Sequence, residues 1–142
     1  MSGFLLDTNI PSEIIKTNAD MRVTSWALTR ENATLHISVI SIGELRKGID
    51  ILSDGKRKVS LENWLKNDLI PSFSGRVLPV TPQIANLWGA LSARRQLAGR
   101  PLSMADGLIA ATALENELTL VTRDVRDYED LGLAIINPWE RV

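Results

Sequence analysis

The chain has 142 residues, of which 44% are hydrophobic and 23% are charged, and its formal net charge is −1. This length fits one domain, which we expect to span residues 1–142, and this composition excludes a disordered chain. The absence of cysteine excludes disulfide bonds, zinc–thiolate sites and thiol nucleophiles, and the net charge excludes a surface that is basic all over.

The N-terminal residues predict a cytoplasmic protein without membrane attachment. No basic segment precedes the first apolar run, and that run reaches an acid, Asp7, after three apolar residues. A signal peptide has a basic segment and a longer apolar run, and a membrane span is longer still.

Five short apolar runs have the length expected of buried strands. They are residues 4–6, 35–39, 77–80, 118–121 and 133–136. Apolar residues at helical spacing lie between them, at 23–27, 42–52, 61–69, 84–91 and 104–114. Strands that alternate with helices predict an α/β fold with a mainly parallel sheet covered on both faces.

Four acidic residues stand where an apolar run ends or an apolar helix begins. Asp7 ends the first run, Glu44 follows the second, Asp106 opens the helix at 104–114, and Asp124 follows the fourth run. Ligands of open parallel sheets bind beyond the carboxyl ends of the strands, so all four carboxylates are expected to reach one edge of the sheet. Carboxylates about 4 Å apart repel by roughly 1 kcal/mol in water and roughly 4 kcal/mol near a protein surface, which favours a bound cation, Mg²⁺ or Mn²⁺.

Glu44 and Asp106 also have a structural explanation. Each lies three positions after a serine, Ser41 or Ser103, as in the capping box that begins many helices. For Glu44 both interpretations stay open. For Asp106 we favour a site, because the helix that it opens is apolar nearly all round and a carboxylate there is unfavourable unless it is paired or bound to a metal.

Asp7 and Asp124 have plainer explanations too. Asn9 is placed to cap a helix that has Pro11 in its first turn. Because Asn9 alone would satisfy that need, Asp7 is left as an unexplained acid at the end of a strand. Asp124 taken singly reads as a solvated loop acid.

In their order along the chain, the segments around these acids resemble the PIN-domain ribonucleases. More narrowly, they resemble the VapC toxins of bacterial toxin–antitoxin pairs, including the FitB-like subgroup. The resemblance spans Phe4 to Trp139, and Gly107 stands where many relatives have alanine, a difference expected to perturb little. The motifs that carry it are Asp7-Thr8-Asn9, Gly43-Glu44-Leu45, Met104-Ala105-Asp106-Gly107 and Thr122-Arg123-Asp124.

The resemblance implies a three-layer α/β/α sandwich around a five-stranded, mainly parallel sheet. It also implies an endoribonuclease that hydrolyses RNA phosphodiester bonds with Mg²⁺ or Mn²⁺. The implied partner is a small VapB-like antitoxin whose tail occludes the acidic site, and the toxin is expected to form a homodimer, or a heterotetramer or larger assembly with the antitoxin. The residues to which it assigns catalysis and metal binding are Asp7, Glu44, Asp106 and Asp124.

Further residues are candidates for supporting contacts. Asn9, Ser41 and Thr122 lie beside the acids and offer oxygens to the metal, to its waters or to phosphate. Cations near the acids are candidates for a rim that contacts RNA phosphate. They are Arg94, Arg95 and Arg100 before the helix at 104–114, Arg46 and Lys47 after Glu44, and Arg123 and Arg126 on either side of Asp124.

Two alternatives stay open. Asp127 is a second candidate for the fourth acid, because some relatives carry asparagine at the position of Asp124 and an acid farther on. The function also has alternatives: a non-catalytic binding module with the PIN fold, or a phosphotransfer protein with Asp7 as the acceptor. The second aspartate that one such phosphotransfer family needs two positions after Asp7 is Asn9 here.

Overall fold

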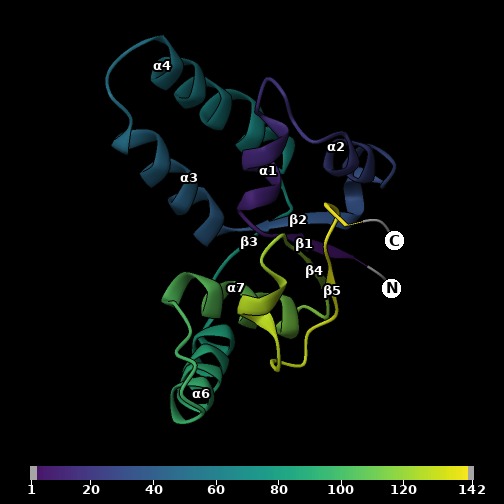
Figure 1. Ribbon diagram of the computed structural model, residues 1–142, viewed down its shortest axis with the longest axis vertical. Helices are drawn as coiled ribbons and strands as arrows, with labels where there is room; N and C mark the ends of the chain where they lie inside the picture. The colour runs from purple at the N-terminus through teal and green to yellow at the C-terminus, as the bar shows by residue number, and fades with distance from the viewer. Residues whose placement is uncertain (1–2, 141–142) are drawn as a thin grey trace.

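The computed structural model describes residues 3–140, so the first two and last two residues of the expected domain lie outside the described residues. Its centre is a five-stranded sheet in the order β3-β2-β1-β4-β5, and all neighbouring strands are parallel (Figure 1). The α/β class and the parallel sheet predicted from the sequence are confirmed. The strands are β1 (Phe4–Leu6), β2 (Leu35–Ser38), β3 (Val77–Leu78), β4 (Thr119–Val121) and β5 (Ile135–Ile136).

Helices connect these strands and cover the sheet. One segment has π-helical hydrogen bonding, which the apolar periodicity around it did not predict. Among residues 3–140, no helix is both long and apolar enough to cross a membrane. The helical elements are α1 (Asn9–Ile14), α2 (Met21–Leu28), η1 (Asn32–Thr34), α3 (Val39–Ile51), α4 (Lys56–Asn63), the π-helical η2 (Trp64–Leu69), α5 (Ile70–Ser72), α6 (Pro82–Leu97), α7 (Met104–Glu115) and η3 (Val125–Tyr128).

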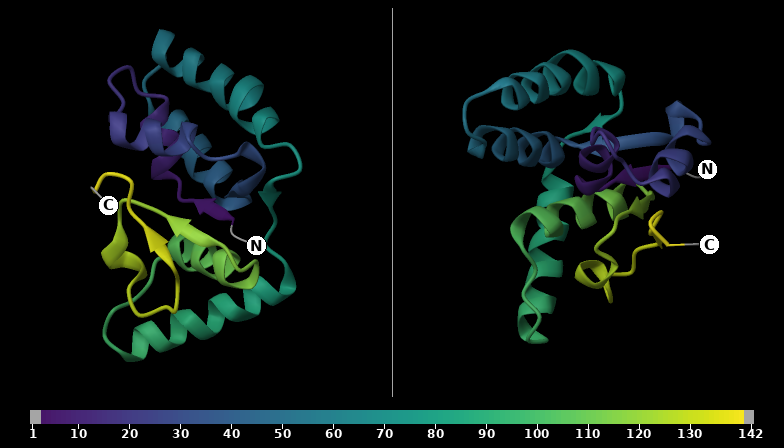
Figure 2. Two further views of the ribbon diagram at one scale, coloured as in Figure 1. Left: turned by 90° about the vertical axis from the view of Figure 1, so that its right-hand side faces the viewer. Right: turned by 45° about the horizontal axis from the view of Figure 1, so that its top comes forward.

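The helices form a layer on each face of the sheet, with α3 and α4 on one side and α6 and α7 on the other (Figure 2). Successive side chains of a strand point to opposite faces. In the central strand β1, Leu6 packs into the core under α1 to η2, and Leu5 packs into the core formed with α6 and α7. The three-layer sandwich is therefore built on both faces of β1.

The chain after β1 stays beside the end of β4. The N–H of Asp7 donates to the carbonyl of Val121 at 2.9 Å, which extends the pairing of the two strands by one residue. The next residue after β4 is Thr122, which is fully buried. The polar residues that follow β1 and β4, Asp7 and Thr122, therefore lie side by side at one edge of the sheet.

Strand β2 passes directly into α3. Ser38 ends the strand, and its hydroxyl accepts the N–H of Ile40, which makes Ser38 the N-cap of the helix. The strand predicted to reach Val39 is therefore one residue shorter. This tight junction brings the first half of α3 to the edge where β1 and β4 end.

Helices α6 and α7 approach closely where Gly107 faces Trp88. A Cβ atom on Gly107 would lie 2.6 Å from Trp88 Cδ1 and 3.2 Å from Leu102 Cδ2. Glycine lets the indole ring lie against the backbone of α7 in its first turn. The close packing of Trp88 on α7 in this chain therefore depends on glycine at position 107.

Candidate active site

Asp7 forms the floor of the site, immediately after β1, and only 5% of it is exposed. Its Oδ1 accepts the N–H of Thr8 at 2.8 Å, and its Oδ2 accepts the hydroxyls of Thr122 at 2.7 Å and Tyr128 at 3.1 Å. Burial raises the pKa of Asp7 from 3.8 to about 6, and the Asp106 carboxylate adds to the rise, although the three hydrogen bonds oppose it. Buried carboxylates with a raised pKa are common at functional sites.

Asp106 lies in the first turn of α7, and seven consecutive residues after it, 107–113, are buried as the sequence predicted. The Ser103 hydroxyl accepts the N–H of Asp106 at 3.2 Å, so Ser103 does cap the helix. The Asp106 carboxylate faces Tyr128, whose hydroxyl lies 3.0 Å from Oδ1. Burial, Asp7 and Asp106 raise the pKa of Tyr128, so this phenol stays protonated and serves as a donor. Ser103 therefore caps α7, and the Asp106 carboxylate is left available to the site.

Glu44 reaches the site from the first half of α3. Its Oε1 accepts the hydroxyl of Thr8 at 2.5 Å, and Thr8 Oγ1 lies 2.8 Å from the Oγ of the buried Ser41. The capping interpretation of Ser41 and Glu44 is wrong, because Ser38 caps α3 and Ser41 lies within the helix. Ser41 instead orients Thr8, and Thr8 orients Glu44.

Asp124 follows Thr122 and Arg123 after β4 and is exposed. Asn9 Nδ2 donates to Asp124 Oδ2 at 3.1 Å, and Thr122 Oγ1 accepts the N–H of Asp124 at 3.0 Å. The expected capping role of Asn9 is wrong, because Thr8 has the N-cap position and Asn9 is the first residue of α1. Asn9 Oδ1 is buried and has no hydrogen-bond partner among residues 3–140, so this acceptor is unsatisfied.

Asp127 has different surroundings. It lines a neighbouring cavity with Arg123, Arg126 and Asn137. Desolvation raises its pKa, and the carboxylates of Asp106 and Asp124 add to the rise. Asp124 lines this neighbouring cavity and also the cavity of the other three acids, which Asp127 does not. The geometry therefore favours Asp124 as the fourth acid.

The four acids named from the sequence line one cavity of about 290 Å³, called the acidic cavity below. Its lining residues are Asp7, Thr8, Asn9, Ser12, Glu44, Asp106 and Asp124. The sequence did not point to Ser12, although it lies one helical turn after Thr8, a spacing that would place it on the same face of α1.

The chemistry of the acidic cavity fits a hard cation. Mg²⁺ and Mn²⁺ prefer oxygen ligands, and Mg²⁺ usually keeps several waters beside one or two carboxylates. Residues with carboxylate, hydroxyl and amide side chains all line this opening. Within residues 3–140, no three acidic or histidine side chains are near enough to enclose an ion as they stand. Glu44, Asp106 and Asp124 are instead hydrogen-bonded to a hydroxyl or an amide.

Neither Arg94 nor Arg95 lines the acidic cavity. Arg94 is exposed and donates to the carbonyl of Asp130 at 3.1 Å. Arg95 is only 6% exposed, which contradicts the expectation that it contacts RNA phosphate. Its guanidinium donates, at 2.9 to 3.2 Å, to the carbonyl oxygens of Arg100, Asp127 and Glu129. Arg95 therefore fixes the chain around η3.

Together the fold and the site define a class: a parallel α/β domain in which carboxylates from separate segments gather at the carboxyl edge of the sheet. The model of the PIN domain family matches residues 4–132, and the chain belongs to this family.

Comparison with individual proteins agrees. The chain is 38% identical to VapC ribonuclease Y4jK of Sinorhizobium fredii over 136 residues, 96% of this chain and 97% of the relative. It is 35% identical to Toxin FitB of Neisseria gonorrhoeae over 135 residues, 95% of this chain and 97% of the relative. A solved structure of FitAB bound to an IR36 DNA fragment matches with a TM-score of 0.91 and 32% identity, covering 98% of this chain and 97% of that chain. The predicted resemblance to VapC-type PIN domains, including FitB, is confirmed.

Proposed function

We propose that this chain is a metal-dependent endoribonuclease that acts as the toxin of a VapBC-type toxin–antitoxin pair. The observation that carries the proposal is the acidic cavity, where four carboxylates from separate segments of a PIN domain face one opening. Relatives that match almost the whole chain bear the names VapC ribonuclease and Toxin FitB, which supports RNA as the substrate. The cytoplasm is the proposed compartment, since cellular RNA is found there.

Asp7 and Asp106 are the residues that would hold the cation most directly, and Glu44 and Asp124 would contribute from the rim. A bound Mg²⁺ or Mn²⁺ supplies charge stabilisation to the phosphate and an activated water. The raised pKa of Asp7 supports this assignment, because a neighbouring cation favours the ionised form that burial disfavours. Thr122 and the Thr8 N–H orient Asp7 for this role.

Other residues at the cavity would bind and orient RNA. The amide of Asn9 lines the cavity and holds Asp124, and the Ser12 hydroxyl is proposed to donate to a phosphate oxygen. Arg123 and Arg126 are exposed beside Asp124 and stay candidates to contact phosphate, whereas the buried Arg95 does not.

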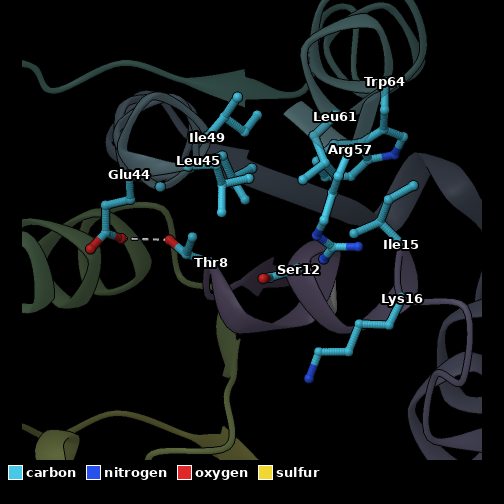
Figure 3. Close-up of a pocket in the computed structure, with 12 residues that line it drawn as sticks. Thr8, Ser12, Ile15, Lys16, Glu44, Leu45, Ile49, Arg57, Leu61 and Trp64 are labelled. Atoms are coloured by element: carbon cyan, nitrogen blue, oxygen red, sulfur yellow. Dashed lines mark hydrogen bonds between the residues drawn. The ribbon is translucent and has the colours of Figure 1, made fainter. Parts of the chain in front are cut away.

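A second, more apolar groove of about 270 Å³ adjoins the acidic cavity, and Thr8, Ser12 and Glu44 line both (Figure 3). We call it the apolar groove. Apolar side chains from α3, α4 and η2 line one part of it, and two cations, Lys16 and Arg57, lie at the end away from Glu44. The apolar residues in this part of the groove include Leu45, Ile49, Leu61 and Trp64.

We propose that the tail of the antitoxin occupies the apolar groove. Its apolar side chains would pack against Leu45 and Ile49, an acidic side chain would pair with Arg57, and a basic side chain would reach the acidic cavity and occlude it. The similarity to FitAB bound to DNA supports a toxin that works in an assembly with a second protein. The homodimer and the heterotetramer or larger assembly stay predictions.

An RNA cleavage assay tests the proposed function. Purified toxin without antitoxin should cut single-stranded RNA in Mn²⁺ or Mg²⁺ and should stop in EDTA. Asp106→Asn should lose roughly 100-fold in rate, whereas Asp68→Asn, which changes an exposed acid of η2, should not change it.

Other outcomes would select the alternatives. A folded wild-type protein that binds antitoxin but leaves RNA intact in both metals would show a non-catalytic PIN-fold module. The phosphotransfer alternative lacks support, since the family is a different one. Covalent labelling of Asp7 by a phosphoryl donor would support the phosphotransfer alternative.

A further inference from the structure

Tyr128 is the buried residue at the acidic cavity whose role the proposed chemistry does not yet explain. It is the single tyrosine of the chain, ends η3, and is 1% exposed. Its ring belongs to the core formed with α6 and α7, beside Ile84 and Leu131 among others. A buried phenol normally has a hydrogen-bond partner for its hydroxyl, so the partners indicate what the residue is for.

The hydroxyl of Tyr128 lies between two of the four acids. It is 3.1 Å from Asp7 Oδ2 and 3.0 Å from Asp106 Oδ1. A phenol has one proton, so it donates to one carboxylate at a time, and both carboxylates must stay within reach of the same oxygen. Tyr128 thus links the end of β1 to the first turn of α7.

This link also decides which carboxylate oxygens remain available. Asp7 Oδ2 faces both Tyr128 and Thr122, whereas Asp7 Oδ1 accepts only the backbone N–H of Thr8. Asp106 Oδ1 faces Tyr128, and among residues 3–140 Asp106 Oδ2 accepts no hydrogen bond. One oxygen of each carboxylate therefore keeps lone pairs that a cation can use.

The position of Tyr128 is fixed from both sides. Arg95 donates to the carbonyl of Asp127 at 3.2 Å and to the carbonyl of Glu129 at 3.1 Å, the residues immediately before and after Tyr128. Because Arg95 is itself buried in α6, it holds this part of the chain against a rigid helix. The phenol oxygen therefore has a fixed position within hydrogen-bonding distance of both carboxylates.

We propose that Tyr128 is a positioning residue that holds Asp7 and Asp106 at the separation and orientation that a divalent cation requires. The inference rests on the proposed metal-dependent function and adds to it a residue that does not touch the metal. Loss of a group that orients metal ligands typically lowers metal affinity about 10- to 100-fold. We expect this loss when the hydroxyl is removed.

Calorimetric titration of the full-length, antitoxin-free toxin with Mn²⁺ tests the proposal. Tyr128→Phe removes only the hydroxyl and keeps the ring that fills the core, and its Mn²⁺ affinity should fall about 10- to 100-fold. Thr112→Val is the matched control, because it removes a buried hydroxyl of α7 that is bonded to the carbonyl of Leu108, away from the cavity. This control should bind Mn²⁺ as the wild type does. Saturating Mn²⁺ should restore most of the cleavage rate of Tyr128→Phe.

A second measurement does not depend on a variant at position 128. Because Tyr128 is the single tyrosine, a ¹³C-tyrosine label gives one ring environment in the spectrum. Addition of Mg²⁺ should shift these signals in the wild type and leave them unchanged in Asp106→Asn.

The outcomes separate this inference from the proposed function. If Tyr128→Phe binds Mn²⁺ with wild-type affinity while Asp106→Asn does not, the positioning role is wrong and the metal site stands. If the wild type itself binds neither cation, the proposed function fails together with this inference. Unchanged tyrosine signals in a wild type that binds Mg²⁺ would also overturn the positioning role.

Discussion

The substitution Asp7→Asn should stabilise the metal-free protein. Asp7 is 5% exposed, and the rise of its pKa from 3.8 to about 6 means that the folded protein disfavours the ionised carboxylate. At about 1.4 kcal/mol for each tenfold change in acidity, ionised Asp7 costs the folded state about 3 kcal/mol. Asparagine cannot ionise, so this cost disappears.

The hydrogen bonds around Asp7 allow the substitution. The amide oxygen of an asparagine can accept the N–H of Thr8, and the amide nitrogen can donate to the hydroxyls of Thr122 and Tyr128, which can turn to accept. Tyr128 then keeps its proton for Asp106. The buried Thr122 hydroxyl is the exception, because it donates to Asp7 in the wild type and an amide nitrogen cannot accept its proton. Losing this acceptor costs about 1–2 kcal/mol and offsets part of the gain.

The effect should depend on pH in a defined direction. At pH 4 the Asp7 carboxyl is neutral in the folded chain and about half ionised in the unfolded chain, so its ionisation contributes less than about 1 kcal/mol to the difference between wild type and Asp7→Asn. As the pH rises through about 6, the wild type loses the stability that belonged to the neutral form. At pH 8 ionisation favours the variant by about 3 kcal/mol. After the loss of the Thr122 acceptor, the variant should still be more stable by about 1–2 kcal/mol, or roughly 3–6 °C in Tm.

Thermal and urea unfolding in EDTA, at pH 4 and at pH 8, measure this difference. Asp68→Asn is the control, because it removes an exposed carboxylate of η2 and should change stability little at either pH. Millimolar Mn²⁺ should then stabilise the wild type and not Asp7→Asn, since a ligand that binds only the folded state raises its stability. If Asp7→Asn is less stable than the wild type at pH 8 in EDTA, Asp7 is a hydrogen-bonding anchor and the electrostatic reasoning for a cation site is refuted.

Three other predictions concern different parts of the molecule. Gly107→Ala should destabilise the protein by about 1–3 kcal/mol in urea unfolding, because its Cβ would overlap Trp88. Gly89→Ala in α6, whose Cβ meets nothing within 4 Å, should be neutral or stabilising. Equal stabilities for the two variants would contradict the packing described for Gly107. Arg57→Glu should weaken antitoxin binding at least about 10-fold in a pull-down titration and leave RNA cleavage intact. Lys56→Glu, which changes the neighbouring residue outside the apolar groove, should bind the antitoxin normally. Tight binding by both variants would place the antitoxin elsewhere. Asp124→Asn should lower the cleavage rate roughly 10- to 100-fold and Asp127→Asn only slightly, and the reverse order would make Asp127 the fourth acid.

The placement of the four acids was predictable because it depends on a general property of parallel sheets. The strands were visible as apolar runs, and the ends of parallel strands meet at one edge. Asp7 and Asp124 each follow a strand of the sheet, at its first and its third residue after the strand, and both line the cavity found in the structure. For the same reason the order of the motifs was informative while each motif alone was weak.

The start of α3 shows where local patterns fail. Ser41–Glu44 and Ser103–Asp106 have the same spacing, yet only Ser103 begins a helix. Ser38 takes the cap of α3, and it does so because β2 ends there, which the three-residue spacing does not reveal. Local spacing names the candidates, and the neighbouring element decides among them.

Tyr128, Ser12 and Arg95 show what only the folded chain reveals. Tyr128 meets Asp7 because η3 folds back under β1, a contact between residues far apart in the sequence. Arg95 looked like a surface cation since it stands in a basic pair on a helix, and its burial depends on where η3 packs. Periodicity carries no signal for such contacts.

The most direct test of the acidic cavity is crystallography of the toxin soaked in Mn²⁺, with anomalous diffraction to locate the ion. We expect an anomalous peak within coordination distance, about 2–2.5 Å, of carboxylate oxygens of both Asp7 and Asp106, and no peak there in Asp106→Asn crystals soaked in the same way. If crystals of an RNA-cleaving toxin show no Mn²⁺ at these carboxylates, or show it at another place, the acidic cavity is not the metal site and the catalytic assignment made here is wrong.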